Sequence, residues 1–145
     1  MTVLLTHKPL EPEKLSALVQ RPSYGATVTF LGVTRDHNDG RRVQYLEYEA
    51  YEEMAVQELR RVVDDLKARW SVDVAVAHRL GKLDIGEVSL VVAVASAHRK
   101  EAFDACAEAV DRIKMAVPIW KREVYEGGYV WIGSEEHAEA KSPAG

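Results

Sequence analysis

The architecture follows from one apolar segment, Glu87-Val-Ser-Leu-Val-Val-Ala-Val-Ala95, and from the helical pattern directly after it. Valine and leucine occupy both faces of this segment, as is typical of a central strand covered on both sides. Ser96 stands where a helix N-cap is favoured. The predicted helix runs to about Ala116, and its apolar stripe recurs every three or four residues at Phe103, Cys106, Val110, Ile113 and Val117. We therefore expect this helix to pack on the sheet that contains the strand.

The segments on either side extend the same pattern. Alternation of apolar and polar residues predicts further strands at 24–33, 43–50, 72–80, 119–125 and 129–132. Helical spacing predicts a short helix at 11–20 and a second long helix at 52–70. Residues 81–86 are most simply a hairpin loop, and Pro118 ends the long helix before the last hairpin. The sequence thus predicts an α+β fold with two long helices packed on a mostly antiparallel sheet.

The chain has 145 residues, of which 47% are hydrophobic and 29% charged, as expected of one soluble globular domain. We assign residues 1–132 to a single domain, with the first few residues at its periphery, and 133–145 to a polar C-terminal tail. A formal charge of −4 argues against general nucleic-acid binding. The longest apolar stretch, 88–97, is too short to span a membrane, and no signal peptide precedes it, so we expect a cytoplasmic protein.

The single cysteine, Cys106, lies in the middle of the apolar stripe of its helix. One cysteine excludes an internal disulfide and every zinc site with several cysteines. A thiol buried there has a raised pKa and behaves as a small hydrophobic side chain, so we expect a structural role. The five histidines are scattered without metal-ligand spacing. We expect neither a metal site nor a bound cofactor.

Two cations open the predicted long helix at the end where the helix dipole favours anions. His98 and Arg99 follow Ser96 directly after the buried strand, and a bound phosphate would resolve the conflict by accepting hydrogen bonds from both side chains. The alternative is an arginine paired with a nearby carboxylate and a solvated histidine. Arg35 allows the same two interpretations, as an ordinary loop arginine or as one aimed at an anionic ligand.

Two lysines lie on either side of Pro118. Lys114 is near the C-terminus of the helix, and Lys121 follows the proline among apolar residues. If the chain folds back at Pro118, two close ammonium groups would lower each other's pKa and make one of them a usable amine or general acid. Each lysine also has an explanation without a reaction, the helix dipole for Lys114 and a solvated face for Lys121.

The helix also sets the distance between these groups. Arg99 and Lys114 are 15 residues apart, which is about 22 Å at 1.5 Å per residue. A small substrate cannot touch both side chains in one chain. If both serve one site, that site is shared between two subunits, and a symmetric dimer carries two equivalent pockets.

Three motifs are informative together: Phe30-Leu-Gly-Val-Thr-Arg-Asp-His-Asn38, Ser96-Ala-His-Arg99 and Lys114-Met-Ala-Val-Pro-Ile-Trp-Lys-Arg-Glu123. In order and spacing they resemble the family of the catalytic, large subunit of molybdopterin synthase, over about residues 24–132. The resemblance implies an α/β hammerhead-like fold. It also implies a sulfurtransferase of molybdenum cofactor biosynthesis, which converts cyclic pyranopterin monophosphate into molybdopterin by adding two dithiolene sulfurs.

The same resemblance implies partners and residue roles. Sulfur would arrive as the C-terminal Gly-Gly thiocarboxylate of a small ubiquitin-like carrier subunit, and a homodimer of the large subunit would form the core of a heterotetramer. Lys114 and Lys121 are the expected catalytic residues. The expected substrate-binding residues are Val33, Thr34, Arg35, His98, Arg99, Arg122 and Glu123, with His98 and Arg99 donated by the partner chain. Two other classes stay open, a non-catalytic anion- or nucleotide-binding dimeric module and a structural dimer subunit with an acidic partner.

Overall fold

The computed structural model describes residues 2–133. Within that range the helices are α1 (Pro12–Val19), α2 (Glu52–Arg69) and α3 (Arg99–Ala116). The strands are β1 (Val3–Thr6), β2 (Ala26–Val33), β3 (His37–Asn38), β4 (Arg41–Ala50), β5 (Val72–Arg79), β6 (Gly81–Asp84), β7 (Val88–Ser96), β8 (Ile119–Tyr125) and β9 (Gly128–Ile132). None of these helices is long and apolar enough to cross a membrane. The tail predicted at 133–145 lies outside the described residues except for Gly133.

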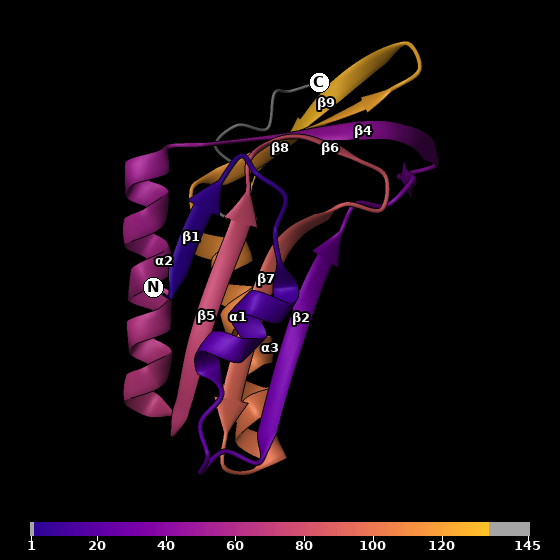
Figure 1. Cartoon of the computed structure of the whole chain (residues 1–145). Helices are drawn as coiled ribbons and strands as arrows, with labels where there is room; N and C mark the ends of the chain where they lie inside the picture. Colours follow the sequence, from indigo (N-terminus) through magenta and orange to yellow (C-terminus); the bar gives the residue numbers. More distant parts are fainter. Residues whose placement is uncertain (1, 134–145) are drawn as a thin grey trace.

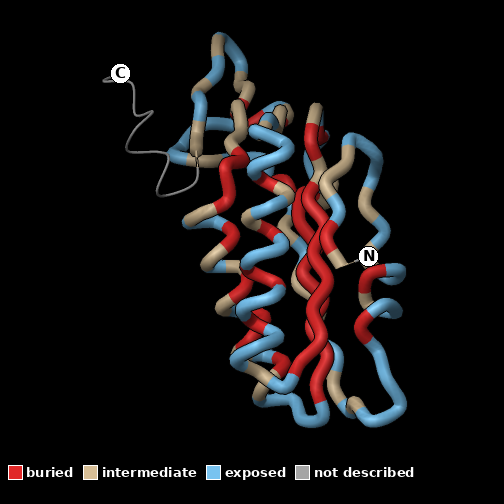
Figure 2. Tube along the Cα trace, turned by 90° about the vertical axis from the view of Figure 1, so that its left-hand side faces the viewer, coloured by how far each residue is buried: buried red, intermediate tan, exposed pale blue. Residues whose placement is uncertain are grey.

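Four strands form the first sheet, in the order β1-β5-β7-β2. β7 pairs antiparallel with β5 on one side and with β2 on the other, and β1 joins β5 in parallel. The long helices α2 and α3 cover one face of this sheet, and the short α1 lies on the other (Figure 1). Buried residues form long stretches in the central strands and recur along the helices that pack on them (Figure 2). Val92 of β7 packs toward the long helices and Val91 toward α1, which confirms the doubly covered central strand.

The second sheet lies across one end of the first. Its strand order is β3-β4-β8-β9, and β6 also pairs with β4. Figure 1 shows this layer at the top of the molecule, at the end that α3 reaches before the chain continues into β8. The crossed layers form one α+β domain with the predicted long helices and mostly antiparallel pairing.

Two segments differ from their predictions because they are too short to show a periodic pattern. Residues 3–6 are not peripheral, since they form β1 and pair in parallel with β5. Residues 81–86 are more than a hairpin loop, since they supply β6, which leaves the first sheet and pairs with β4 of the second. Gly81 permits this departure because its φ of +89° lies in the left-handed region that side chains avoid.

The start of α3 and one residue of its predicted apolar stripe also differ from their predictions. Ser96 belongs to β7, and its hydroxyl donates to the His98 carbonyl oxygen, so the N-cap position falls on His98. Phe103, expected in the apolar stripe, is 59% exposed. Cys106, Ile113 and Val117 of that stripe are buried as predicted, and Ala102, Ala105 and Ala109 complete the buried face.

Candidate active site

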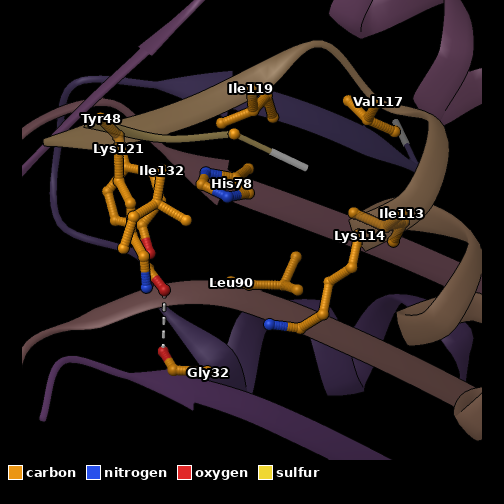
Figure 3. Close-up of a pocket in the computed structure, with 12 residues that line it drawn as sticks. Gly32, Tyr48, His78, Leu90, Ile113, Lys114, Val117, Ile119, Lys121 and Ile132 are labelled. Carbon is orange, nitrogen blue, oxygen red and sulfur yellow. Dashed lines mark hydrogen bonds between the residues drawn. The ribbon is translucent and has the colours of Figure 1, made fainter. Parts of the chain in front are cut away.

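A cavity of about 260 Å³ lies where the two sheets and the C-terminal end of α3 meet. Both sheets contribute to its wall, together with the helix. Labelled in Figure 3 are Gly32, His78 and Leu90 from the first sheet, Tyr48, Lys121 and Ile132 from the second, and Ile113 and Lys114 from α3. The cavity therefore exists only because the second layer crosses the end of the first.

The two lysines predicted as catalytic enter this cavity from different elements. Lys114 extends from the last turn of α3, and Lys121 extends from β8, where it pairs in register with Tyr48 of β4. Figure 3 shows the two side chains approaching from opposite sides. The prediction that the chain folds back at Pro118 and brings Lys121 to the site of Lys114 is confirmed.

The turn at Pro118 has a local cause. Val117, the C-cap of α3, is extended, with φ −79° and ψ 129°, as is favoured for a residue before proline. The Pro118 carbonyl oxygen then accepts a hydrogen bond of 3.3 Å from the Tyr51 N–H. This bond fixes the start of β8 beside the end of β4, so the strand that carries Lys121 runs back across the end of the helix.

Glu123 lies on the same face of β8 as Lys121, because alternate residues of a strand point the same way. The Lys121 Nζ atom is 3.7 Å from Oε2 of Glu123. Glu123 is only 5% exposed, and its carboxylate accepts hydrogen bonds of 2.9 and 3.2 Å from the Asn38 side-chain amide. A buried carboxylate held in this way places a fixed negative charge beside the lysine.

Arg122 points to the opposite face of β8, away from the cavity. Its guanidinium donates to Glu47 at 2.6 Å and lies over the rings of Tyr129 and Trp131, at 4.9 and 5.8 Å from their centroids. The hydrogen bond to Glu47 raises the pKa of Arg122. These contacts connect β8 to β4 and β9. Arg122 therefore stabilises the strand that carries Lys121, on the face opposite the cavity.

The predicted residues Val33, Thr34 and Arg35 follow Gly32, which lines the cavity. Thr34 is buried, and its backbone donates to Glu87 at 3.0 Å and accepts from Gly86 at 2.9 Å. Val33 and Arg35 are exposed on either side of it. The end of β2 therefore reaches the cavity's edge, with Arg35 on the surface beyond it.

His98 and Arg99 lie at the opposite end of α3 and are exposed. The helix is continuous from Arg99 to Ala116, so the stretch from Arg99 to Lys114 spans about 22 Å. Within one chain the predicted site residues thus form two separate groups. One surrounds the cavity, and the other consists of the two cations at the start of α3.

The sequence analysis missed the polar groups on the cavity wall. His78 of β5 is 6% exposed, and burial lowers its pKa to about 4, with a further contribution from the Lys114 charge. Its ring meets Tyr48 edge-on, with 5.0 Å between centroids. Ser89 of β7 is buried beside them. A histidine and a serine within apolar strands were the available signal, because buried polar side chains usually serve a partner.

Cys106 has the structural role that the sequence predicts. It is 4% exposed within the main hydrophobic core, and its Sγ atom is 3.8 Å from the Val92 carbonyl oxygen. Burial raises the pKa of the thiol to about 11, so it remains protonated at neutral pH. A group in this state is a poor nucleophile.

Known proteins share both the sequence pattern and the fold. The family model described as MoaE protein matches residues 5–116. The molybdopterin synthase catalytic subunit of Bacillus subtilis is 44% identical over 132 residues, covering 90% of this chain and 84% of its own length. Molybdopterin synthase from Staphylococcus aureus superposes with a TM-score of 0.89 at 36% identity, covering 92% of this chain and 98% of that one. A complex of subunits 1 and 2 of molybdopterin-converting factor from Helicobacter pylori contains a chain of the same fold, with a TM-score of 0.73 at 21% identity and 90% coverage of both chains.

The fold, the lysine cavity and these relatives define an enzyme of the molybdopterin synthase class, a sulfurtransferase of molybdenum cofactor biosynthesis. The chain belongs to the MoaE protein family. The resemblance carried by the three sequence motifs is thereby confirmed. The relatives therefore favour an enzyme over the two alternative interpretations, the non-catalytic binding module and the structural subunit.

Proposed function

We propose that the cavity between Lys114 and Lys121 is where sulfur is transferred to cyclic pyranopterin monophosphate. The observation that carries this proposal is the entry of two lysines, from α3 and β8, into one cavity that also contains Leu90, Ile113 and Ile119. Electrostatic interactions are stronger beside apolar walls than in bulk water. Two ammonium groups held there suit a reaction in which negative charge moves from sulfur to oxygen.

The proposed sulfur donor is a thiocarboxylate at the C-terminus of a small carrier subunit. Its anionic sulfur bonds to a side-chain carbon of the pterin while a carbon–oxygen bond at that carbon breaks, and the departing oxygen takes up a proton. Water then cleaves the bond between the carbonyl carbon and sulfur. The sulfur stays on the substrate, and the carrier retains a carboxylate. Lys114 orients the carbonyl or transfers protons, and Lys121 stabilises the charge that develops on oxygen. Attack by the Lys114 amine in place of water is the alternative route, and it requires later hydrolysis of the resulting amide.

The phosphate of the substrate is assigned to Arg35 and to His98 and Arg99 of a second copy of the chain. Guanidinium and imidazole groups form charge-assisted hydrogen bonds with phosphate oxygens. The assignment to a second copy follows from distance, because Arg99 is about 22 Å along the helix from Lys114 of the same chain.

The free edge of β2 suggests how two copies meet. Among the described strands, β2 ends the first sheet, and Leu31 and Val33 on it are 42% and 49% exposed. The first residues of β2 lie next to His98, since the Gly25 N–H donates to the Ala97 carbonyl at 3.2 Å. Its last residues reach the lysine cavity at Gly32.

Antiparallel pairing of two β2 edges about a two-fold axis would place the start of one strand beside the end of the other. The strand spans about 24 Å, close to the distance between Arg99 and Lys114. His98 and Arg99 of each copy would then lie near the other copy's cavity. We therefore propose a homodimer with two shared sites and one carrier subunit at each end. The Helicobacter pylori complex of two different subunits supports the second-subunit partner.

A mixed dimer tests the shared site. One chain carries Lys114→Ala and the other Arg99→Ala, with different affinity tags so that the mixed species can be isolated. In a shared arrangement both changes fall in one pocket and the other remains intact, so turnover of the cyclic pterin should be about half that of the wild type. Both parent homodimers should have little turnover, and equally low turnover in the mixed dimer would contradict the shared site.

A further inference from the structure

Three polar groups on the cavity wall have no role in the transfer described above. They are His78, Tyr48 and Ser89, from strands β5, β4 and β7, and His78 and Ser89 are among the few buried polar residues of the described chain. Figure 3 shows the His78 and Tyr48 side chains in the space that Lys114 and Lys121 approach. The positions of their protons follow from the groups that they contact.

The proton positions of Ser89 and Tyr48 are considered first. The Gly32 carbonyl can only accept, so the Ser89 hydroxyl donates to it, at 3.2 Å. The proton of Ser89 is thereby committed to that carbonyl. Burial raises the pKa of Tyr48, so the phenol keeps its proton. The lone pairs of the Tyr48 oxygen can accept a hydrogen bond from a ligand in the cavity.

The same reasoning applies to His78. Its Nδ1 atom lies 2.8 Å from the Arg79 carbonyl oxygen, which cannot donate, so Nδ1 carries a proton. The ring is neutral at pH 7 because burial opposes its protonation. A neutral imidazole has one proton, and Nε2 is therefore an acceptor. The wall formed by β4 and β5 thus offers two acceptors, Nε2 of His78 and the oxygen of Tyr48.

We propose that these two acceptors bind the N–H edge of the heterocycle in the substrate and so determine its orientation between the lysines. The inference rests on the proposed function of the cavity. Lysine ammonium groups only donate, so they recognise the anionic parts of a ligand and leave its N–H groups unsatisfied. A ligand ring that carries N–H donors on one side and anionic groups on the other is complementary to both walls.

The test compares His78→Leu with His78→Gln and Tyr48→Phe in the dimer with its thiocarboxylated carrier. Leucine removes the acceptor, whereas glutamine can return a carbonyl oxygen near the place of Nε2. We expect His78→Leu and Tyr48→Phe each to raise the Kd and the KM for the cyclic pterin about tenfold, with kcat changed less than about threefold. His78→Gln should recover most of the affinity. His7→Leu, a change at an exposed histidine outside the cavity, is the matched control.

A substrate analogue methylated at a ring N–H gives the decisive measurement. It should bind the wild type about tenfold more weakly than the parent compound, and this difference should disappear in His78→Leu or Tyr48→Phe. An unchanged Kd in both variants would overturn the inference, as would a fall in kcat at constant Kd, which would mean that His78 acts on Lys114 instead. If His78→Leu does not fold, Tyr48→Phe and the analogue decide the question. Absence of turnover by the wild type would refute the proposed function itself.

Discussion

The two ends of α3 carry similar side chains in opposite surroundings. At the C-terminal end, Lys114 faces a second sheet that supplies Lys121 and the buried Glu123. At the N-terminal end, His98 and Arg99 are exposed. The two ends therefore differ in whether another layer of the molecule faces the cations. At the C-terminal end the same chain provides that layer, whereas at the N-terminal end we propose that a second copy does.

Lys114→Ala should have the largest effect on activity, because it removes the lysine that α3 contributes to the cavity at its C-terminal end. We expect turnover of the cyclic pterin to fall by a factor of about 10² to 10⁴, as for loss of a group that transfers protons or positions the reacting carbonyl. The measurement is single-turnover formation of the dithiolene, with the dimer verified by light scattering. Lys100→Ala, at the other end of the same helix and paired on the surface with Asp104, should retain full activity. Full turnover in Lys114→Ala would remove this residue from the catalytic role.

Leu31→Lys should disrupt the proposed dimer, which supplies the opposing layer at the N-terminal end of α3, while the residues that line the cavity stay unchanged. A charge on the free edge of β2 opposes pairing with a second copy, so we expect dissociation at micromolar concentration and loss of about nine-tenths of the activity. Sedimentation velocity and turnover, measured over the same concentration range, should fall together. Lys8→Glu, a charge change on the exposed segment after β1, serves as the control. A stable, active Leu31→Lys dimer would place the interface elsewhere.

The pH dependence of stability should report on His78 in the cavity wall when the wild type is compared with a variant at this position. The pKa of His78 is lowered from 6.5 to about 4 by burial. Between these values the unfolded chain binds a proton that the folded chain does not, so the free energy of unfolding decreases as pH falls. The total loss is of the order of 3 kcal/mol between pH 6.5 and 4, and the full contribution is present above pH 6.5.

Urea unfolding at pH 7, 6 and 5 measures this effect in the wild type and in His78→Gln. The variant should lose less stability on acidification, whereas His7→Gln should behave as the wild type. Identical pH profiles for the wild type and His78→Gln would show that the imidazole is not neutral and buried in solution.

Cys106→Ala should have the smallest effect on activity, because the thiol lies in the hydrophobic core and at neither end of α3. We expect turnover to stay within about twofold of the wild type and stability to fall by about 1 kcal/mol through a small cavity in the core. The melting temperature and the rate of dithiolene formation are the measurements. A large loss of activity without a change in melting temperature would give the cysteine a chemical role.

Much of the fold could be predicted from local patterns. The long helices and the central strand have enough residues for their periodicity to be clear, and Pro118 marks the reversal that brings Lys121 to Lys114. The strands β1 and β6 could not be found in this way, because four residues show almost no periodicity and their pairing depends on distant segments. The burial of Phe103 was predicted wrongly, because the buried face of α3 passes through Ala102 and Ala105 at that point of the helix.

The site was predictable to the extent that its residues form sequence motifs. Lys114 and Lys121 belong to one continuous motif, and the fold places them in one cavity. Their neighbours Tyr48, His78 and Ser89 come from three strands whose registers are set by tertiary pairing. No local pattern in the sequence links these three residues.

The continuous length of α3 has a consequence for the timing of catalysis. An unbroken helix holds its two ends at a fixed separation. In the proposed dimer each α3 gives Lys114 to one site and Arg99 to the other. The length of the helix would therefore keep the two reaction centres about 22 Å apart. A half-sulfurated intermediate would then have to leave one centre completely to reach the other, which favours its retention while spent and loaded carriers exchange.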